Sequence, residues 1–400
     1  MTPYDPRRAD VVADPYPVLG RLREEDPVHW SDILGGWVLT RYEDVRSALG
    51  DPRLSADRIS PFLVRQAPTA SEAVQELLHR VGLWVVFTDP PAHTRLRTAL
   101  GRAFTARPIE MLRSRIEAIA DGLLGRAVAA GEMDLIRDFA YPLPVTVIGD
   151  LLGVPPEDHE QLKVWSDDLA SFIGSSLRTP DKYERAARGV LEMHGYFERV
   201  VARRRAKPAD DLVTALLMAG RGDALGEAEL VASCVLLLFA GHETTTNLIG
   251  NGALALLRHP AEARAWRENA GLAMSAVEEI LRFDGPTATM VRIAREDLRV
   301  EDRAIRRGDR LFLMINAANR DPRQFAEPDC LDLRRHDNRH LAFGHGIHFC
   351  LGAPLARLEG QIALPAMLAR FPLLAPRTDA PEWLDSLVFR GMRSLPVALG

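Results

Sequence analysis

Residues 343–352 read FGHGIHFCLG and include three glycines, two histidines and one of only three cysteines in the chain. Because glycine has no side chain, such a stretch can turn sharply or lie close against a flat group. The next residues, APLARLE at 353–359, have a helical pattern in which Pro354 is acceptable only in the first turn. Cys350 is therefore expected where a glycine-rich loop enters a helix N-terminus.

This position favours the thiolate form of Cys350. Free backbone N–H groups and the positive end of the helix dipole lie at a helix N-terminus, and both stabilise a negatively charged sulfur. A thiolate that faces a flat space is the kind of ligand that binds the iron of a haem. Two other interpretations remain open. Cys350 could be an inert buried thiol, or it could bind zinc with His345 and His348, although these three residues crowd six positions and no fourth ligand is evident.

The stretch resembles the haem-binding signature of the cytochrome P450 family, Phe-Gly-x-Gly-x-x-x-Cys-x-Gly. The match lies at Phe343, Gly344, Gly346, Cys350 and Gly352. The resemblance implies that Cys350 is the metal ligand of haem b (iron protoporphyrin IX). It also implies that Phe343 and Gly352 belong to the haem site, with Phe343 packed against the ring near the sulfur.

Composition limits the class of protein. The chain has 400 residues and no linker-like segment, so a single domain over 1–400 is expected. A net charge of −5 argues against a nucleic-acid partner. The N-terminus lacks the apolar core of a signal peptide, and no apolar run is long enough to span a bilayer. Cys234, Cys330 and Cys350 are too scattered for a disulfide framework. We therefore expect a cytoplasmic protein.

The periodicity of apolar residues predicts a mainly α-helical fold with small peripheral β-sheets. Helices are expected at residues 15–25, 42–49, 71–80, 92–104, 108–130, 144–152, 157–174, 181–206, 209–219, 226–259 and 273–282. Strands are expected at 28–30, 37–40, 290–294 and 311–315, and the segment 389–397 has the pattern of a hairpin tip. Residues 51–88 show little pattern apart from one helix, and the resemblance implies a substrate-covering loop there.

The helix predicted at 92–104 carries His93 and Arg97 at positions i and i+4, on one face. On spacing alone, an ordinary solvated helix face is the favoured interpretation. The same pair follows Asp89-Pro90-Pro91, however, and this arrangement resembles the clamp that holds the haem propionates in the family. The resemblance assigns the same role to Arg292 and His348.

One helical pattern runs from 226 to 259, about 50 Å at 1.5 Å per residue. Its middle, AGHETTTN at 240–247, is poor in helix formers. Threonine hydroxyls can compete for the carbonyl four residues back, so we expect the helix to open locally and leave a groove; a capped helix break is the alternative. The stretch resembles the oxygen-binding groove of the family. The resemblance implies that Thr244 hydrogen-bonds dioxygen and that Glu243 delivers protons.

Glu279 and Arg282 lie at positions i and i+3 of the last predicted helix, where they can pair. Glu-x-x-Arg is a common pattern and means little alone. About seventy residues before Cys350, it resembles the structural ion pair of the family, which implies that Glu279 and Arg282 support the fold and the haem loop.

The resemblance implies one large helical domain, with haem between the long helix and the helix that follows Cys350. The implied activity is that of a haem-thiolate monooxygenase, which inserts one oxygen atom of O2 into an organic substrate. Three alternatives are a haem-binding protein without oxygen chemistry, a peroxide-driven enzyme of the same family, and a zinc protein.

The substrate is expected to be a medium-sized hydrophobic molecule, because the residues assigned to the pocket are mostly apolar. A secondary metabolite, a steroid, a terpene or a fatty acid fits this description. The expected lining is Val86, Leu236, Phe239, Ala240, Ala288, Thr289, Val388 and Phe389.

Electrons must come from another protein, since nothing in the chain resembles a flavin, nicotinamide or iron–sulfur module. Similar bacterial proteins take electrons from NAD(P)H through a ferredoxin reductase and a ferredoxin. A small acidic ferredoxin is expected to dock on the face nearest Cys350, where Arg102, Arg357 and His345 are candidates for pairing with its carboxylates. The protein is expected to be a monomer.

Overall fold

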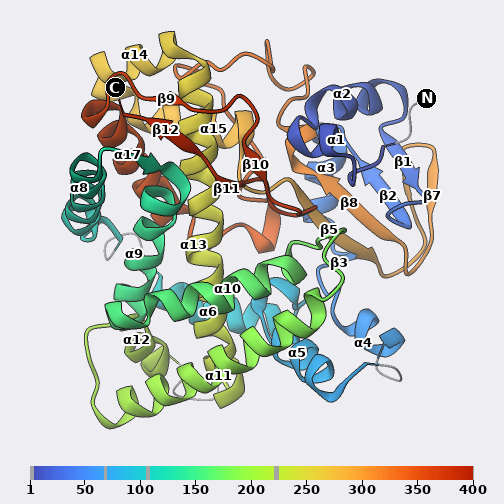
Figure 1. The fold of residues 1–400 in the computed structure, drawn as a ribbon. Coiled ribbons are helices and arrows are strands. Elements are labelled where there is room, and N and C mark those ends of the chain that lie inside the picture. The colour runs from blue at the N-terminus through green and yellow to red at the C-terminus, as the bar shows by residue number, and fades with distance from the viewer. Residues whose placement is uncertain (1–3, 67–69, 105–108, 220–224, 400) are drawn as a thin grey trace. The chain divides into compact units, whose positions relative to one another are not determined.

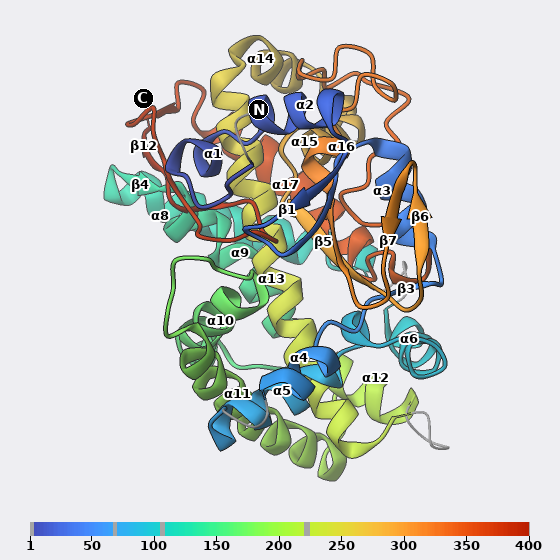
Figure 2. The same cartoon turned by 90° about the vertical axis from the view of Figure 1, so that its right-hand side faces the viewer.

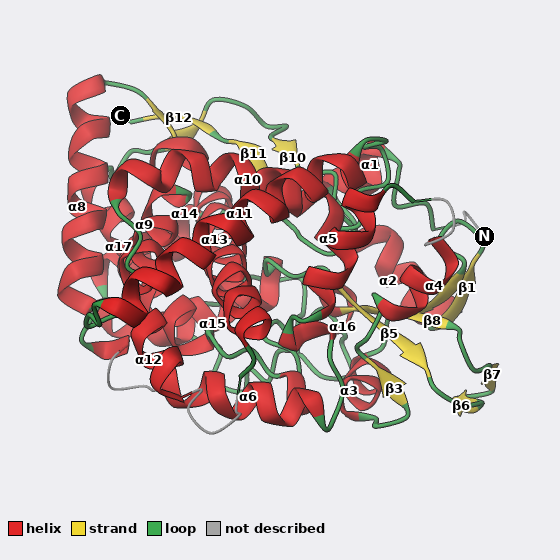
Figure 3. Ribbon diagram, turned by 90° about the horizontal axis from the view of Figure 1, so that it is seen from below, coloured by secondary structure: helices red, strands yellow, loops and turns green. Residues whose placement is uncertain are grey.

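The computed structural model describes residues 4–66, 70–104, 109–219 and 225–399. Helices make up most of these residues and strands form only small sheets (Figure 3). The mainly α-helical fold predicted from the sequence is thus confirmed. No helix in the described ranges is long and apolar enough to cross a membrane.

The helices have the following bounds: α1 Ala9–Ala13, α2 Tyr16–Glu25, α3 Tyr42–Gly50, α4 Ser60–Gln66, α5 Glu72–Gly82, α6 Ala92–Ala103, α8 Arg113–Ala130, α9 Pro142–Leu152, α10 His159–Ile173, α11 Lys182–Ala206, α12 Leu212–Ala219, α13 Glu227–Arg258, α14 Pro260–Glu268, α15 Ala273–Asp284, α16 Ile315–Ala318 and α17 Ala353–Arg370. The strands are β1 Val28–Ser31, β2 Gly36–Leu39, β3 Leu54–Ser55, β4 Met133–Asp134, β5 Thr289–Ala294, β6 Leu298–Val300, β7 Arg303–Ile305, β8 Arg310–Met314, β9 Ala375–Pro376, β10 Glu382–Trp383, β11 Met392–Ser394 and β12 Pro396–Ala398. Figure 1 labels most of them.

The chain divides into two compact units. The first comprises Met1–Leu54, Leu112–Leu143 and Thr244–Gly400, and the second comprises Ser55–Met111 and Pro144–Glu243. Helix α13 contributes its first half to the second unit and its second half to the first. The single domain expected over residues 1–400 remains a prediction.

The second unit is built almost entirely of helices, with α11 packed against α10 and α5 (Figure 2). Helices α10 and α11 approach closely at Gly189, where a Cβ atom would stand 2.7 Å from the main-chain oxygen of Trp165. Only glycine permits this contact. The sequence missed α4, whose seven residues are too short to show a periodicity.

The main sheet of the first unit has the strand order β1-β2-β8-β5-β3. Strand β2 runs antiparallel to β1 and parallel to β8, which is antiparallel to β5. Alternate residues face opposite sides. Leu311 and Leu313 of β8 pack with Leu49 of α3, whereas Phe312 packs with Leu19 of α2. The sheet is therefore buried on both faces, between α2 and α3.

The hairpin tip predicted at 389–397 is confirmed only for residues 389–391, which lie in the loop between β10 and β11. Strand β11 pairs with β10, and β12 pairs with β4 and β9, so the two strands of this segment belong to different sheets. Pro396 has no N–H group to offer a partner strand, and the N–H of Leu135 bonds to the carbonyl of Leu395 at 2.9 Å. The hairpin that does form joins β10 to β11, and Phe389 lies in its loop.

Helix α13 is one α-helix of 32 residues (Figure 1), so the local opening expected at 240–247 is not seen. The hydroxyl of Thr246 is buried without a hydrogen-bond partner among the described residues and does not compete for a backbone carbonyl. Gly241 serves packing instead, since a Cβ there would lie 2.8 Å from Ile148 of α9. Further along, a Cβ at Gly252 would lie 3.0 Å from Ile280 of α15 and from Leu364 of α17. The second half of α13 therefore packs against both of these helices.

A buried ion pair on α15 organises the irregular chain between α16 and α17. Arg282 donates to Glu279 through Nε and Nη2, both at 2.8 Å, and both side chains are fully buried. Arg282 also donates to the carbonyls of Asn319 at 3.0 Å, Pro328 at 2.7 Å and Cys330 at 3.0 Å. The guanidinium thus fixes three separate points of a segment that has little regular structure of its own.

Glu279 has further donors that the sequence did not reveal. Its carboxylate accepts from the N–H of Asp332 at 3.0 Å, from Nδ2 of Asn338 at 3.0 Å and from Nε of Arg335 at 3.1 Å. The side chain of Asn319 then accepts from the N–H of Leu341 at 2.8 Å, just before the Cys350 loop. Through Arg282 and Asn319, these bonds fix the position of Leu341, at the start of that loop, relative to α15.

Replacing Glu279 with alanine should lower the free energy of unfolding by about 3–5 kcal/mol, because Arg282 would remain buried without its counter-charge. Glu43→Ala is a matched control: Glu43 and Arg46 have the same i, i+3 spacing, but their side chains are 70% and 44% exposed, so a change below about 1 kcal/mol is expected. Urea unfolding curves measure both. Equal losses in the two variants would show that burial of the pair is unimportant.

Candidate functional site

The residues before Cys350 form a tight loop that only glycine can close. Gly344 and Gly346 have φ angles of +75° and +74°, a region that other residues rarely adopt. The N–H of Cys350 donates to the carbonyl of Phe343 at 2.9 Å, and that of Phe349 donates to Gly346 at 3.1 Å. A Cβ at Gly346 would also lie 3.3 Å from the Cα of Gly50, so the loop packs closely on the end of α3.

Cys350 lies just before helix α17, as the sequence predicts. Gly352 is the N-cap residue of α17, and Pro354 lies in the first turn. Cys350 is half-buried, and a Cβ built at Gly352 would meet no atom within 4 Å, so there is room beside the loop. The N-terminal end of α17 favours a negative sulfur at this position.

An arginine braces the loop from α17. The Cζ atom of Arg357 lies 4.5 Å from the ring centre of Phe343, and its Nε and Nη2 donate to the two oxygens of Glu278 at 2.7 and 2.8 Å. The hydrogen bonds that Arg357 donates to Glu278 are the main cause that raises the pKa of Arg357, and the charge of Glu278 and the neighbouring Cys350 raise it further. A permanent cation therefore lies within electrostatic reach of the sulfur.

Glu278 and His340 are residues of this brace that the sequence interpretation missed. His340 Nε2 lies 3.2 Å from Glu278 Oε2. Burial raises the pKa of Glu278, but hydrogen bonds from Arg357 and His340 outweigh it and lower the pKa to about 2. The sequence offered one indication of this role for Glu278: it is adjacent to Glu279 in a helix, so the two side chains point in different directions from α15. Because Arg357 already pairs with Glu278, it is less available to pair with the carboxylates of a ferredoxin.

His93 and Arg97 lie on α6, in the second unit. His93 is buried rather than solvated; burial, followed by the neighbouring Arg97 guanidinium, lowers its pKa, so the imidazole is neutral at pH 7. The exposed face of α6 carries Arg95 instead, which pairs with Glu229 at 2.7 Å. The interpretation as an ordinary solvated face therefore does not hold for His93.

Arg292 and His348 belong to the first unit. Arg292 is buried on β5, and its Nη1 donates to the carbonyl of Val291 at 3.0 Å. His348 is half-buried in the short turn of 3-10 helix at Gly346–His348, directly before the cysteine. Arg292 thus belongs to the main sheet and His348 to the Cys350 loop, and both side chains can donate hydrogen bonds. Their contact with haem propionates remains a prediction.

Glu243 and Thr244 lie at the centre of α13 and keep accessible surface. Both are half-buried, whereas His242, Thr245 and Thr246 on the same turn are buried. His242 donates its Nδ1 proton to the carbonyl of Leu238 at 2.7 Å, and burial lowers its pKa to about 4. The acid and the alcohol, rather than the histidine, are therefore the groups on this turn that can reach a substrate or water.

The residues assigned to the substrate fall into two groups. Val86 and Ala240 of the second unit are exposed, and Ala288, Val388 and Phe389 of the first unit are half-buried. The remaining three are packed away. Leu236 and Phe239 are buried, with the ring of Phe239 6.0 Å from that of Trp84, and Thr289 is buried with its hydroxyl 3.5 Å from the sulfur of Met314. Contact of the eight residues with a substrate remains a prediction.

The donor set around Cys350 fits a haem better than zinc. Across the described part of the chain, no three His, Cys, Asp or Glu side chains come together as a metal site, so His345, His348 and Cys350 do not make one. A haem needs only one axial ligand from this side. The accessible cysteine, the glycine loop with room beside it and the nearby cation together fit that requirement.

Comparison with known proteins agrees with this geometry. The model of the family "Cytochrome P450" matches residues 38–392. The polyketide biosynthesis cytochrome P450 PksS of Bacillus subtilis is 40% identical, and the alignment covers 99% of this chain and 98% of PksS. The cytochrome P450 monooxygenase PikC of Streptomyces venezuelae is 41% identical, with 97% and 92% covered.

A solved structure agrees as well. P450BioI, determined in complex with an acyl carrier protein ligated to hexadec-9Z-enoic acid, is similar with a TM-score of 0.91 and 36% identity, covering 98% of this chain and 99% of that chain. The signature around Cys350, the helical fold and matches over nearly the whole length all lead to one conclusion. The chain belongs to the cytochrome P450 family of haem-dependent monooxygenases.

Proposed function

We propose that the protein inserts one oxygen atom of O2 into a medium-sized hydrophobic molecule of bacterial secondary metabolism, by hydroxylation or epoxidation. The observation that carries the proposal is the Cys350 loop, whose two left-handed glycines place the cysteine before the N-terminus of α17. The proposed place of action is the cytoplasm, and the proposed state is a monomer.

When bound, haem b would supply the capacity to activate dioxygen, and the thiolate of Cys350 would hold its iron. His93, Arg97, Arg292 and His348 would hold the propionates, and Phe343 would pack near the sulfur. Arg357 keeps Phe343 and the thiolate in a fixed environment through its bonds to Glu278. The chain would thereby hold one strong ligand in place, and no cluster of metal-binding side chains is found among the described residues.

The half-buried pair on α13 has two separate tasks in this proposal. The hydroxyl of Thr244 donates a hydrogen bond to dioxygen, and the carboxyl group of Glu243 passes protons through water to the same place. The neighbouring His242 cannot share this work, because it is buried, neutral and bonded to a carbonyl. An acid and an alcohol on one turn favour oxygen insertion over simple haem binding or peroxide-driven chemistry.

The substrate class follows from the apolar character of the accessible lining, Val86, Ala240, Ala288, Val388 and Phe389. Relatives include the polyketide biosynthesis cytochrome P450 PksS and a 6-deoxyerythronolide B hydroxylase. The structure of P450BioI with an acyl carrier protein adds the option that a substrate arrives on a carrier. We propose a polyketide-like or acyl compound as the first group to test by spectral titration.

Electrons are proposed to come from NAD(P)H through a ferredoxin reductase and a ferredoxin. Arg102 is exposed on α6, beside an open surface groove lined by Pro90, Thr94 and Ala99. It has no carboxylate within 4.0 Å among the described residues, so it can pair with an acidic partner. Arg357 is engaged by Glu278 and is the weaker candidate.

Cys350→Ser should abolish the red-shifted Soret band of the reduced carbon monoxide complex, because a hydroxyl is a poor, protonated ligand. Cys234→Ser and Cys330→Ser are the controls: burial raises the pKa of Cys234 to about 12, and Cys330 is exposed and lies outside the loop of residues 343–352. Their spectra should match the wild type. A red-shifted band in Cys350→Ser would remove the basis of the proposed function.

Thr244→Val should keep haem and ligand binding but divert electrons to hydrogen peroxide, since the hydroxyl that directs proton delivery is lost. Glu243→Gln should slow turnover. Thr246→Val, two residues away, removes a buried hydroxyl that has no hydrogen-bond partner in the described part of the chain and should leave coupling unchanged. The measurement is product formed per reduced cofactor consumed. Normal coupling in Thr244→Val, or equal uncoupling in Thr246→Val, would contradict the assigned role.

Arg102→Glu should slow reduction by ferredoxin in stopped-flow experiments, with an effect that fades as salt screens the charges. Arg188→Glu changes the net charge equally on the exposed surface of α11 and serves as the control. Arg357→Glu should differ from both, because it sets a carboxylate against Glu278 and disturbs the haem spectrum itself. Equal rates in Arg102→Glu and wild type at low salt would exclude docking through Arg102.

A further inference from the structure

We propose that Arg390 is a positioning residue for substrate selection: it fixes the loop that presents Val388 and Phe389. The inference rests on the proposed function, in which these two residues line the substrate pocket. It goes further by naming what holds them in place. Arg390, its partners and the loop all belong to the first unit of the chain.

The loop in question connects β10 to β11 and comprises residues 384–391. Its ends are joined by the N–H of Leu384, which donates to the carbonyl of Gly391 at 2.9 Å. On the side of β5, the N–H of Ala288 donates to Val388 and the N–H of Arg390 donates to Pro286, both at 2.8 Å. These bonds fix the main chain on either side of Phe389.

The side chain of Arg390 ties this loop to two other parts of the unit. Its Nε donates to Asp284 at 3.1 Å, and its Nη1 and Nη2 donate to the carbonyls of Val12 at 2.6 Å and Ala13 at 2.9 Å. The guanidinium stacks on Trp383, 3.4 Å from the ring centre, and is almost fully buried. All three nitrogens of the guanidinium therefore have an acceptor, and one acceptor is charged.

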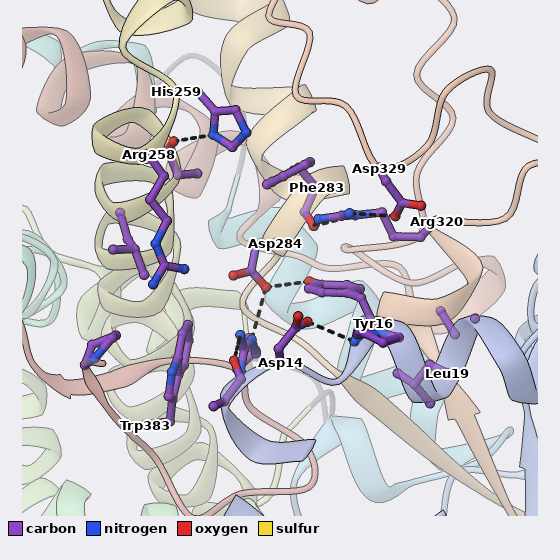
Figure 4. Close-up of a pocket in the computed structure, with 18 of the residues that line it drawn as sticks. Asp14, Tyr16, Leu19, Arg258, His259, Phe283, Asp284, Arg320, Asp329 and Trp383 are labelled. Atoms are coloured by element: carbon purple, nitrogen blue, oxygen red, sulfur yellow. Dashed lines mark hydrogen bonds and ion pairs between the residues drawn. The ribbon is translucent and has the colours of Figure 1, made fainter. Parts of the chain in front are cut away.

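Asp284 is itself held in place. The hydroxyl of Tyr16 donates to the same carboxylate oxygen at 2.5 Å, and Figure 4 shows Asp284 between Tyr16 and Trp383 of β10. Burial, and then the charge of Asp284, raises the pKa of Tyr16 well above its ordinary value, so the hydroxyl remains a donor. The carboxylate thus has a fixed direction toward Arg390.

Helix α13 holds the main chain of the same residue. Nδ2 of Asn251 donates to the carbonyl of Arg390 at 2.9 Å and to that of Asp284 at 3.1 Å. One turn earlier, Asn247 fills the space beside Gly391, where a Cβ would stand 1.9 Å from its Oδ1. The two asparagines follow Thr244 by three and seven residues on α13. The position of the loop that carries Phe389 is thereby fixed relative to the helix that carries Thr244.

Packing is incomplete around Arg390. A cavity of about 750 Å³ has Tyr16, Asp284, Trp383 and Arg390 in its wall (Figure 4). A smaller cavity of about 50 Å³ is bordered by Phe389 and Arg390. Leu387 packs in the apolar core and the main-chain bonds hold the ends of the loop, so the directional bonds of Arg390 add the restraint at the end that carries Val388 and Phe389. Loss of these bonds should let Val388 and Phe389 move while the rest of the unit stays folded.

The test compares Arg390→Lys with Arg320→Lys. Arg320 is also buried, stacks between Tyr16 and Phe283 at 4.1 and 3.8 Å, and pairs with Asp329 at 2.9 Å, but it makes no bond to the loop. Lysine keeps the charge in both variants and loses the forked geometry. A common loss of stability would therefore appear in both, whereas loop displacement should appear only in Arg390→Lys.

Two readouts are made on the purified protein. The first is hydrogen exchange of the peptide that contains residues 384–391, which should quicken about tenfold in Arg390→Lys. The second is spectral titration with two nitrogen ligands of the iron. Imidazole is too small to reach the loop and should bind as in wild type. Econazole is bulky and should bind with a dissociation constant changed by about tenfold, the size expected for one lost charge-assisted hydrogen bond.

The outcomes separate the possible explanations. Unchanged exchange at 384–391, equal effects on imidazole and econazole, or the same pattern in Arg320→Lys would each overturn the positioning role. Should Arg390→Lys fail to fold, Asp284→Asn keeps the shape of the carboxylate and removes its charge, and the same two readouts apply. A wild-type protein without any spectral shift from imidazole would contradict the proposed haem function, while the exchange measurement would still test the loop.

Discussion

The structure of the first unit depends on one buried ion pair, Glu279 with Arg282. Two opposite charges with no exposure to solvent are costly unless every remaining donor and acceptor finds a partner. Here the requirement is met by main-chain carbonyls on one side and by Arg335 and Asn338 on the other. Those partners come from a segment with few helices or strands. The two charges are therefore fully hydrogen-bonded only when this segment has its folded conformation.

Helix α15 supports the Cys350 loop from both ends through two adjacent acids. Glu279 acts through Asn319, whose side chain binds the N–H of Leu341 ahead of the loop. Glu278 acts through Arg357, which lies over Phe343 from the helix that follows the loop. Helix α15 thus supports the chain both before Cys350, at Leu341, and after it, at Arg357. As the proposed ligand of the haem iron, Cys350 would benefit from such support.

Much of the fold could be predicted from periodicity, because amphipathic helices reveal themselves locally. Helices α11 and α13 begin and end within a few residues of the expected positions, and the Cys350 loop was recognisable from its glycines. Partners far apart in sequence could not be predicted. Arg335 is 56 residues from Glu279, and Arg357 is 79 residues from Glu278. Local spacing contains no information about which distant acid a given arginine will meet.

The errors have the same origin. The segment 389–397 alternates like a hairpin, yet β11 and β12 join different sheets because their partners, β10 and β4, lie elsewhere in the chain. The threonines of α13 suggested an opened helix, but close packing with α9 at Gly241 keeps it regular. For the candidate site, residue types and order were predictable. The burial of Leu236, Phe239 and Thr289 was not, since side-chain burial depends on neighbours from other elements.

The contacts of Arg390 have a consequence for how its surroundings can evolve. Its partners at positions 12 and 13 are main-chain carbonyls, as is the Pro286 oxygen that its own N–H binds. Nearly any residue can supply a carbonyl, so the N-terminal segment is free to drift in sequence while the anchor persists. A contact of this kind would not be detectable as correlated substitutions between residues 12–13 and Arg390. A deletion that shortens the N-terminal segment by a few residues would nevertheless break it.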